Sequence, residues 1–227
     1  MDTNINFDEF SEALKSKDWR VRNKAVQDLG WGDVRAVSFL IPMLKDEIVA
    51  IRAEAAEALG RLRDKKAYDA LANAISDENE QVRFKVVHAL GDIKDIRAFP
   101  ILLNILEDKN EYFNTRFASA CSLGKLGDKK AFEPLLNALK DNNVPVRVGA
   151  VMGLEKLGDL QAIEPLINAL TDEDEEVRIA AIKALGIFKD ERAIPILEWL
   201  VENDTTPTWK GSINELAAKT IKLIKQT

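Results

Sequence analysis

The chain is poor in the residues that build disulfides and metal sites. Among its 227 residues there is one cysteine, Cys121, and one histidine, His88. A disulfide within the chain is therefore excluded, and a zinc site lacks the usual set of ligands. A single cysteine also suits a reducing compartment, so we expect the protein in the cytoplasm.

Long apolar runs and an excess of positive charge are missing as well. No apolar run approaches the roughly eighteen residues of a membrane span, and the first residues, MDTNINFDEF, are too polar for a signal peptide. The net charge is −6, and lysine and arginine alternate with aspartate and glutamate. Because nucleic-acid binders usually carry a basic stripe, we expect neither a nucleic-acid partner nor membrane contact.

Signatures of catalysis are absent too. The sequence contains no nucleophile motif, no glycine loop of the kind that cradles phosphates and no metal-ligand spacing. With a single histidine, general acid–base chemistry has no obvious agent. We therefore expect a non-catalytic protein that has no catalytic residue, no metal and no cofactor.

What the chain does contain is a segment repeated about every thirty-one residues. Its centre reads Val-Arg-x-x-Ala-x-x-x-Leu, with variations, and it occurs six times. A repeat of this length is one supersecondary unit that is stacked many times, so the period predicts a solenoid. The repeats are marked by their arginines, which are Arg22, Arg52, Arg83, Arg116, Arg147 and Arg178.

Each copy predicts two antiparallel helices. Apolar residues one position before the arginine and three, four and seven after it share one face of a helix, which we call the B helix; in the first copy they begin with Val21. An apolar segment with an early proline, such as AFEPLLNALKD, precedes it and predicts the A helix. Glycines after the B stripe, such as Gly60 and Gly91, predict the left-handed residue that ends the helix. The fifth copy delays its glycine to Gly158, which predicts a longer B helix.

The whole chain predicts an all-α fold, a right-handed α-solenoid of about seven antiparallel helix pairs. We assign residues 1–227 to a single repeat domain. The outer pairs, about 1–30 and 190–227, depart from the pattern. Because a terminal repeat must present a polar outer face, we expect these two pairs to act as caps.

The pattern A-x-x-P-L-x-x-A-L-x-D followed by V-R-x-x-A-x-x-A-L-G resembles HEAT repeats, in particular the short HEAT-like repeats of phycobilin lyases. The resemblance covers nearly the whole chain and implies an α-solenoid. It implies no single activity, because this class includes bilin lyases, iron hydroxylases, DNA glycosylases and scaffolds. The iron hydroxylases use paired His-Glu ligands, whereas alanine follows His88 here. No chromophore-handling residue of the lyases can be matched.

Aspartates accompany the repeat arginines, six residues before most of them and eight before Arg116. One interpretation is a row of arginines that binds anions. The other is a structural Asp–Arg ladder that ties each repeat to its neighbour, and we favour it because the pairing recurs with the fold. The ladder consists of Asp46, Arg52, Asp77, Arg83, Asp108, Arg116, Asp141, Arg147, Asp172 and Arg178.

The B-helix face opposite the packed stripe holds the candidate binding residues. In a HEAT-like stack we expect this face to line the concave surface, and it contains the positions one and five after each arginine. Large apolar side chains on a face expected to meet water favour a groove for a protein or peptide partner. The candidates in the middle three copies are Phe84, His88, Phe117, Cys121, Val148 and Met152.

Three alternatives accompany this groove. A tight superhelix would bury these side chains between adjacent B helices. His88, Cys121 and Met152 are soft metal ligands, but helices about 8–10 Å apart spread them widely, so we expect no metal. The chain could instead be a lyase-like or chaperone-like factor that holds a tetrapyrrole on a client protein, as the resemblance allows. The partner's identity and the oligomeric state are not determined by the sequence.

Overall fold

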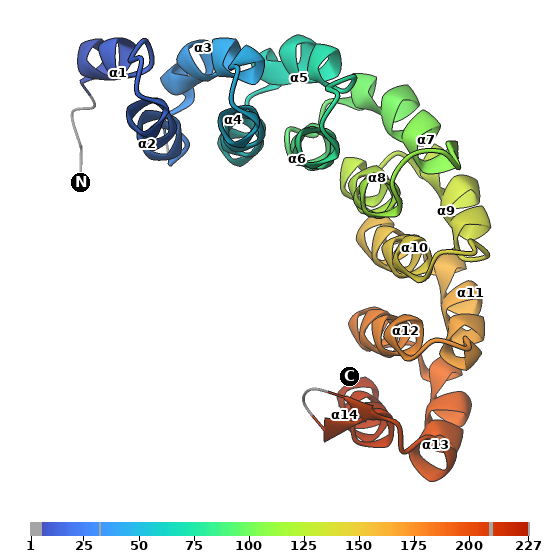
Figure 1. Cartoon of the computed structure of the whole chain (residues 1–227). Coiled ribbons are helices and arrows are strands. Elements are labelled where there is room, and N and C mark those ends of the chain that lie inside the picture. Colours follow the sequence, from blue (N-terminus) through green and yellow to red (C-terminus); the bar gives the residue numbers. More distant parts are fainter. Residues whose placement is uncertain (1–5, 32, 209–210, 227) are drawn as a thin grey trace. The chain divides into compact units, whose positions relative to one another are not determined.

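The computed structural model describes residues 6–31, 33–208 and 211–226 (Figure 1). Parts of the predicted terminal caps, residues 1–5, 209, 210 and 227, lie outside these ranges. The described residues form fourteen α-helices and one two-stranded antiparallel ribbon. The helices alternate between A and B helices and make seven pairs, so the prediction of an all-α solenoid of helix pairs is confirmed.

The A helices are short and the B helices longer. The A helices are α1 (Phe7–Ala13), α3 (Val37–Leu40), α5 (Tyr68–Ala74), α7 (Phe99–Glu107), α9 (Phe132–Ala138), α11 (Ile163–Asn168) and α13 (Ile194–Asn203). The B helices are α2 (Trp19–Leu29), α4 (Val49–Leu62), α6 (Glu80–Asp92), α8 (Phe113–Leu126), α10 (Val144–Leu157), α12 (Glu175–Phe188) and α14 (Ile213–Lys225). The ribbon between α13 and α14 consists of β1 (Pro207–Thr208) and β2 (Gly211–Ser212).

Short 3-10 turns lead into the A helices or end them. They are η1 (Val34–Ala36), η2 (Ile41–Lys45), η3 (Lys65–Ala67), η4 (Ile96–Ala98), η5 (Lys129–Ala131), η6 (Leu160–Ala162), η7 (Ala169–Thr171) and η8 (Glu191–Ala193). In the second pair, α3 gives way to η2 where Pro42 lies near the start of the turn. Proline has no N–H to donate and its ring crowds the preceding turn, which explains why the α-helix stops there.

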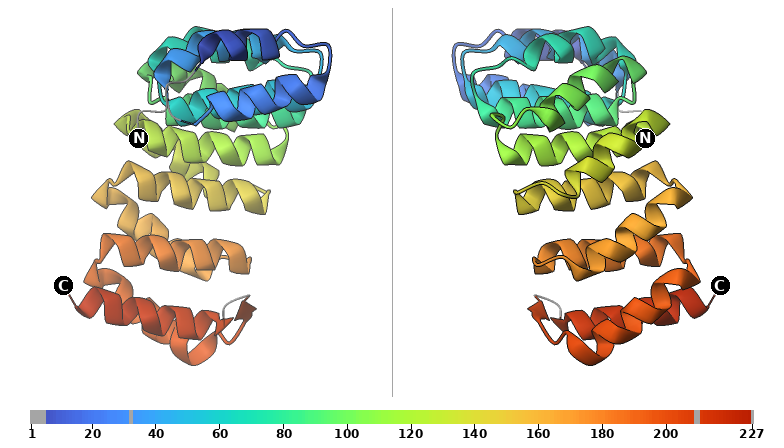
Figure 2. Two further views of the ribbon diagram at one scale, coloured as in Figure 1. Left: turned by 90° about the vertical axis from the view of Figure 1, so that its left-hand side faces the viewer. Right: turned by 90° about the vertical axis from the view of Figure 1, so that its right-hand side faces the viewer.

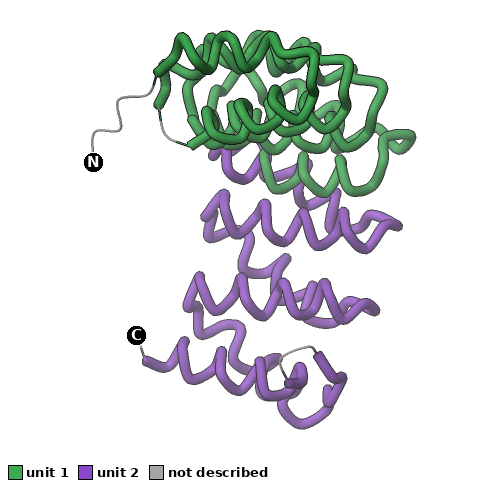
Figure 3. The backbone as a smooth tube through the Cα atoms, turned by 60° about the vertical axis from the view of Figure 1, so that its left-hand side comes forward, with its two compact units in different colours: residues 1–122 green, residues 123–227 purple. Residues whose placement is uncertain are grey.

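The contacts divide the chain into two compact units, residues 1–122 and 123–227 (Figure 3). In the first unit the A helices form one layer, and α2, α4 and α6 form the other (Figure 1). Residues 113–122 of α8 belong to this unit, and the buried Ser122 hydroxyl donates to the Val87 carbonyl of α6 at 3.0 Å. In the second unit α10, α12 and α14 lie side by side (Figure 2).

The core of each unit lies between its A and B layers. The predicted B stripe fills it: Val26, Leu59 and Leu90, for example, are at most 2% exposed. Val21 is the exception, because it is 42% exposed although it belongs to the predicted stripe. The equivalent Ile51 is fully buried, and the difference is that Val21 belongs to the first helix pair, which has no preceding pair among the described residues.

In α2 the stripe glycine does follow the end of the helix, because α2 ends at Leu29 and Gly30 is its C-cap, with a φ of −70° that is not left-handed. In α4, α6, α8 and α12 the glycine lies inside the helix, so the prediction that it ends the helix is wrong there. Gly60 and Gly91 lie within α4 and α6. A Cβ atom on Gly60 would lie 2.9 Å from the Ala89 Cα atom, and one on Gly124 would lie 2.2 Å from the Gly153 carbonyl oxygen. These glycines therefore let neighbouring B helices approach closely.

The left-handed residues lie about three positions further along the chain. They are Arg63, Lys94, Gly127, Gly158 and Lys189, with φ between 51° and 75°. The B helix of the fifth copy, α10, has 14 residues, as do α4 and α12. The prediction of an extended helix in that copy is also wrong, because α4, α8 and α12 continue past their glycines and reach the same length.

Candidate functional site

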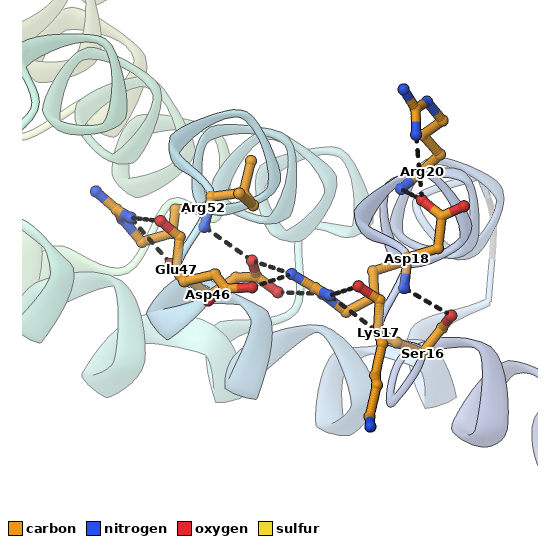
Figure 4. A network of polar contacts seen from close by, with 9 residues as sticks. Ser16, Lys17, Asp18, Arg20, Asp46, Glu47 and Arg52 are labelled. Atoms are coloured by element: carbon orange, nitrogen blue, oxygen red, sulfur yellow. Dashed lines mark hydrogen bonds and ion pairs between the residues drawn. The ribbon is translucent and has the colours of Figure 1, made fainter.

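The repeat arginines link consecutive helix pairs. Arg52 donates from Nη1 to the carbonyl of Asp46, six residues earlier, at 2.9 Å. Its Nε and Nη2 atoms donate to the carboxylate of Asp77, 25 residues later, at 2.7 and 3.0 Å. Figure 4 shows one step of this network, in which the main-chain carbonyls of Asp46 and Glu47 accept hydrogen bonds from the Arg52 guanidinium. Each such aspartate therefore offers its carbonyl to the arginine of its own repeat and its carboxylate to the arginine before.

The same geometry recurs at other steps within each unit. In the first unit the Arg22 fork contacts the Asp46 carboxylate at 2.7 and 3.0 Å. In the second unit the Arg147 fork contacts the Asp172 carboxylate at 3.0 and 2.8 Å. Arg147 also donates to the Asp141 carbonyl at 2.9 Å. These two-pronged contacts are the strong form of an arginine–carboxylate pair.

Two carboxylates that sequence reasoning did not select also take part. Arg83 pairs with Glu111 at 2.9 and 2.8 Å, while Asp108 accepts a hydrogen bond from the Asn110 amide. The linker there is two residues longer than in the neighbouring copies. This extra length is the one feature of the sequence that indicates a different carboxylate partner for Arg83. Likewise Arg178 pairs with Asp204 at 2.9 Å and donates to the Asp172 carbonyl at 2.8 Å.

Arg116 and Asp141 are both buried charged members of the set. Arg116 is 2% exposed, and its Nε atom donates to the Leu106 carbonyl at 3.0 Å. Asp141 is 6% exposed and accepts from the Asn143 amide at 3.0 Å. Both side chains belong to the interior and are not presented to an external ligand.

The charges of the network stabilise one another. Burial of the Asp46 carboxyl raises its pKa, but hydrogen bonds from Arg22 and the Ile48 amide and the attraction of the nearby arginines lower it further, so the pKa lies below its usual value. The guanidinium forks of Arg22, Arg52 and Arg147 already contact protein oxygens. This arrangement favours the structural interpretation over a row of arginines that binds anions.

The six candidate binding residues divide between the two units. In the first unit, Phe84 and His88 of α6 are half-buried, and their rings meet edge to face with centroids 4.6 Å apart. Phe117 of α8 is half-buried, whereas Cys121 is only 5% exposed. The alternative of burial between B helices therefore applies to Cys121. In the second unit, α10 carries the half-buried Val148 and the exposed Met152.

A pocket of about 260 Å³ lies beside the aromatic side chains of α6. Its rim is charged: Lys85 forms an ion pair with Glu57, and Arg61 approaches Glu57 at 3.2 Å. The hydrogen bond from Lys85 is the main reason why the pKa of Glu57 lies below its usual value. An aromatic floor inside a polar rim is typical of protein–protein interfaces. The lining residues are Glu57, Arg61, Phe84, Lys85, His88, Ala89 and Asp92.

The described residues contain neither a cluster of metal ligands nor a membrane-spanning helix. Within residues 6–31, 33–208 and 211–226, no three histidine, cysteine, aspartate or glutamate side chains gather as metal ligands would. Within the same ranges, no helix combines the length and apolar character needed to cross a bilayer.

Comparison with known proteins identifies the repeats. The family model of HEAT repeats matches residues 7–76, 69–147 and 132–217. A search of curated proteins gives no significant match. Among solved structures, a chain of the CpcE–CpcF complex of phycocyanin lyase from Nostoc sp. PCC7120 is similar, with 22% identity and a TM-score of 0.65 over 98% of this chain and 95% of that one.

Two further structures are similar in fold. One is a HEAT-like repeats protein from the archaeon Thermococcus onnurineus NA1, with 19% identity and a TM-score of 0.59 over 99% of both chains. The other is a chain in the structure of Kap95p bound to RanGDP, with 14% identity and a TM-score of 0.63 over 97% of this chain and 37% of that one. At these identities the likeness concerns the fold alone. The repeat matches, however, extend over most of the sequence, and the chain belongs to the HEAT-repeat family.

Proposed function

We propose that this protein is a non-catalytic scaffold of the cytoplasm that binds a protein or peptide partner on the face of its B helices. The observation that carries the proposal is the half-buried aromatic set of Phe84, His88 and Phe117 in the first unit. The equivalent positions of the first copy are the polar Asn23 and Gln27. Aromatic side chains placed this way are common energetic centres of interfaces.

Binding at this face would gain free energy from burial of the two phenylalanine side chains. Full burial of a phenylalanine side chain is favourable by about 1.5–3 kcal/mol. Because Phe84 and Phe117 are already half-buried, each retains only part of that gain for binding. Glu57, Arg61 and Lys85 form a charged rim. This rim would contribute mainly to the specificity of binding and less to its affinity. Val148 and Met152 offer a second, smaller apolar area in the other unit.

A site-specific crosslinking experiment tests the proposal. A photoreactive phenylalanine analogue is placed at position 84 or 117, and a control chain carries it at position 99 in the A helix α7, where Phe99 is also half-buried. We expect protein adducts from positions 84 and 117 and none of the same mass from position 99.

The partner identified in this way then allows an affinity measurement. The double variant Phe84→Ser, Phe117→Ser should weaken binding at least tenfold by titration calorimetry, and Phe99→Ser should not. If the double variant lowers the melting temperature while the adducts and the affinity stay the same, the aromatic residues are packing residues and the proposed face is wrong.

The second candidate is a lyase-like or chaperone-like factor that holds a tetrapyrrole on a client protein. The fold likeness to the phycocyanin lyase complex favours it. The low exposure of Cys121, 5%, speaks against a thiol that reaches a chromophore directly. Titration with a bilin and with haem, followed by visible absorbance, separates the candidates: a saturable spectral shift supports the second, and an unchanged ligand spectrum supports the scaffold.

A further inference from the structure

Trp31, at the end of α2, is the most exposed large hydrophobic side chain among the described residues, at 75%. Exposed tryptophan is unfavourable in water and is enriched in binding sites. It lines a pocket of about 500 Å³ with Val34, Leu62 and two arginines, Arg61 and Arg63. We call these five residues the Trp31 patch. It belongs entirely to the first unit.

The ring of Trp31 is supported from one side. The Arg61 guanidinium lies 4.7 Å from its centre, within the range of a cation–π contact. Arg61 is in turn held by Glu54 at 2.8 Å and donates to the Gly30 carbonyl at 3.4 Å. An aromatic surface held in place by such contacts loses little conformational freedom when a ligand binds.

Folding does not require an arginine at position 63, because glycine fills the equivalent position after α10. Arg63 is the residue that ends α4, and its φ of 54° lies in the left-handed region, which favours glycine. The equivalent residue after α10 is Gly158, with φ of 69°. Arg63 is exposed, and within the described residues no carboxylate forms an ion pair with it.

The charge of the lining indicates the ligand. Two cations, Arg61 and Arg63, and one carboxylate, Asp92, face the pocket. Arg61 is already paired with two carboxylates, Glu54 and Glu57, which leaves Arg63 as the group that meets an incoming anion. The apolar walls are Trp31, Val34 and Leu62. The ligand that matches both features has an apolar side chain beside a carboxylate.

We propose that the Trp31 patch binds an acidic peptide segment, with a bulky apolar side chain placed against Trp31 and an adjacent carboxylate held by Arg63. This surface is distinct from the face of Phe84 and Phe117, although both pockets share Arg61 and Asp92 as lining residues. The occupant is a short peptide and not a nucleic acid, because Arg63 is a single cation that matches a single carboxylate, whereas a nucleic acid would extend beyond the patch along a chain whose net charge is −6.

The test uses the full chain and three labelled synthetic peptides of equal length, made of aspartate and leucine, of lysine and leucine, and of aspartate and serine. Fluorescence anisotropy measures their binding. We expect the aspartate–leucine peptide to bind at least tenfold more tightly than the other two. Trp31→Ala should weaken that binding at least tenfold, and Arg63→Gly about fivefold.

The glycine substitutions separate binding from folding. Arg63→Gly relieves the left-handed conformation, so its melting temperature should stay the same or rise while binding falls. Lys94→Gly is the matched control, because Lys94 has a φ of 51° at the end of the next B helix but does not line the pocket. It should bind the peptide as the unchanged protein does.

Several results would overturn the proposal. They are equal binding of the acidic and basic peptides, no binding of the aspartate–leucine peptide, or unchanged binding by Trp31→Ala and Arg63→Gly. Tighter binding of a labelled single-stranded oligonucleotide than of the peptide would point to a nucleic-acid site instead. If the Phe84→Ser, Phe117→Ser variant loses peptide binding while Trp31→Ala and Arg63→Gly retain it, the peptide binds on the B-helix face. The two proposals can therefore fail independently of each other.

Discussion

Four of the repeat arginines, Arg22, Arg52, Arg116 and Arg147, are buried cations whose N–H donors need acceptors. Arg52, for example, divides its donors between the carbonyls of its own repeat and the Asp77 carboxylate of the next. A buried pair of this kind adds little net stability, but loss of one partner leaves an uncompensated charge. We therefore predict that the ladder contributes mainly to the register between neighbouring helix pairs.

Removal of one ladder carboxylate should be costly. Asp172→Ala leaves the Arg147 guanidinium without its fork partner, and the side chains of that pair are 7% and 14% exposed. We expect a loss of about 3 kcal/mol in the free energy of unfolding, measured by urea denaturation. Glu198→Ala removes the exposed pair with Lys225, whose side chains are 54% and 55% exposed, and should cost less than about 1 kcal/mol. Equal losses in the two variants would contradict the ladder.

The same pairs predict how stability depends on pH. Burial raises the pKa of the Asp77 carboxyl, but hydrogen bonds from Arg52 and the Asn79 amide and the nearby arginines lower it further, so its pKa is below the ordinary value. A lowered pKa in the folded state adds stability above the unfolded value of about 4, and this stability is lost as the pH falls. The melting temperature should therefore fall between about pH 5 and pH 3.

The neutral variant provides the comparison. Asp77→Asn should start from a lower melting temperature at pH 7 and lose less of it on acidification than the unchanged protein does. Parallel curves for the two proteins would show that Asp77 does not contribute to the acid sensitivity.

At the scale of the helix, the spacing between B helices is set by glycine. The apolar stripe is read correctly from a period of 3.6 residues, because its members, such as Val86 and Leu90, are buried. The role of the glycines cannot be read from the sequence in the same way. Close approach of two helices and termination of one helix both select glycine at the end of an apolar stripe. The helices in fact continue to Leu62 in α4 and Leu157 in α10, where left-handed residues end them.

Two glycines of the second unit distinguish the two roles. Gly124→Ala would place a methyl group 2.2 Å from the Gly153 carbonyl oxygen, so neighbouring helices must separate. Such overpacking costs about 1–3 kcal/mol. Gly158→Ala meets no atom within 4 Å but keeps a φ of 69°, and should cost about 1 kcal/mol. Thermal denaturation measures both, and a Gly124→Ala variant as stable as the unchanged protein would refute the close-packing role.

At the scale of the whole chain, seven helix pairs repeat one contact pattern. Within each unit, neighbouring B helices pack on one another, as α4 does on α2 and α6 and α12 does on α10 and α14. The stability of such an array is approximately a sum over units and their interfaces.

The sequence by itself determined the class of fold, the pairing of helices and the positions of the buried stripe, because these follow from a helical period and a repeat length that every copy restates. Only the tertiary structure decided which carboxylate reaches each arginine, so that Glu111 and not Asp108 pairs with Arg83. It also decided that Cys121 is buried while Phe84 is half-buried, and that Trp31 is supported by Arg61. These outcomes depend on distances between neighbouring repeats, and a periodic pattern does not contain those distances.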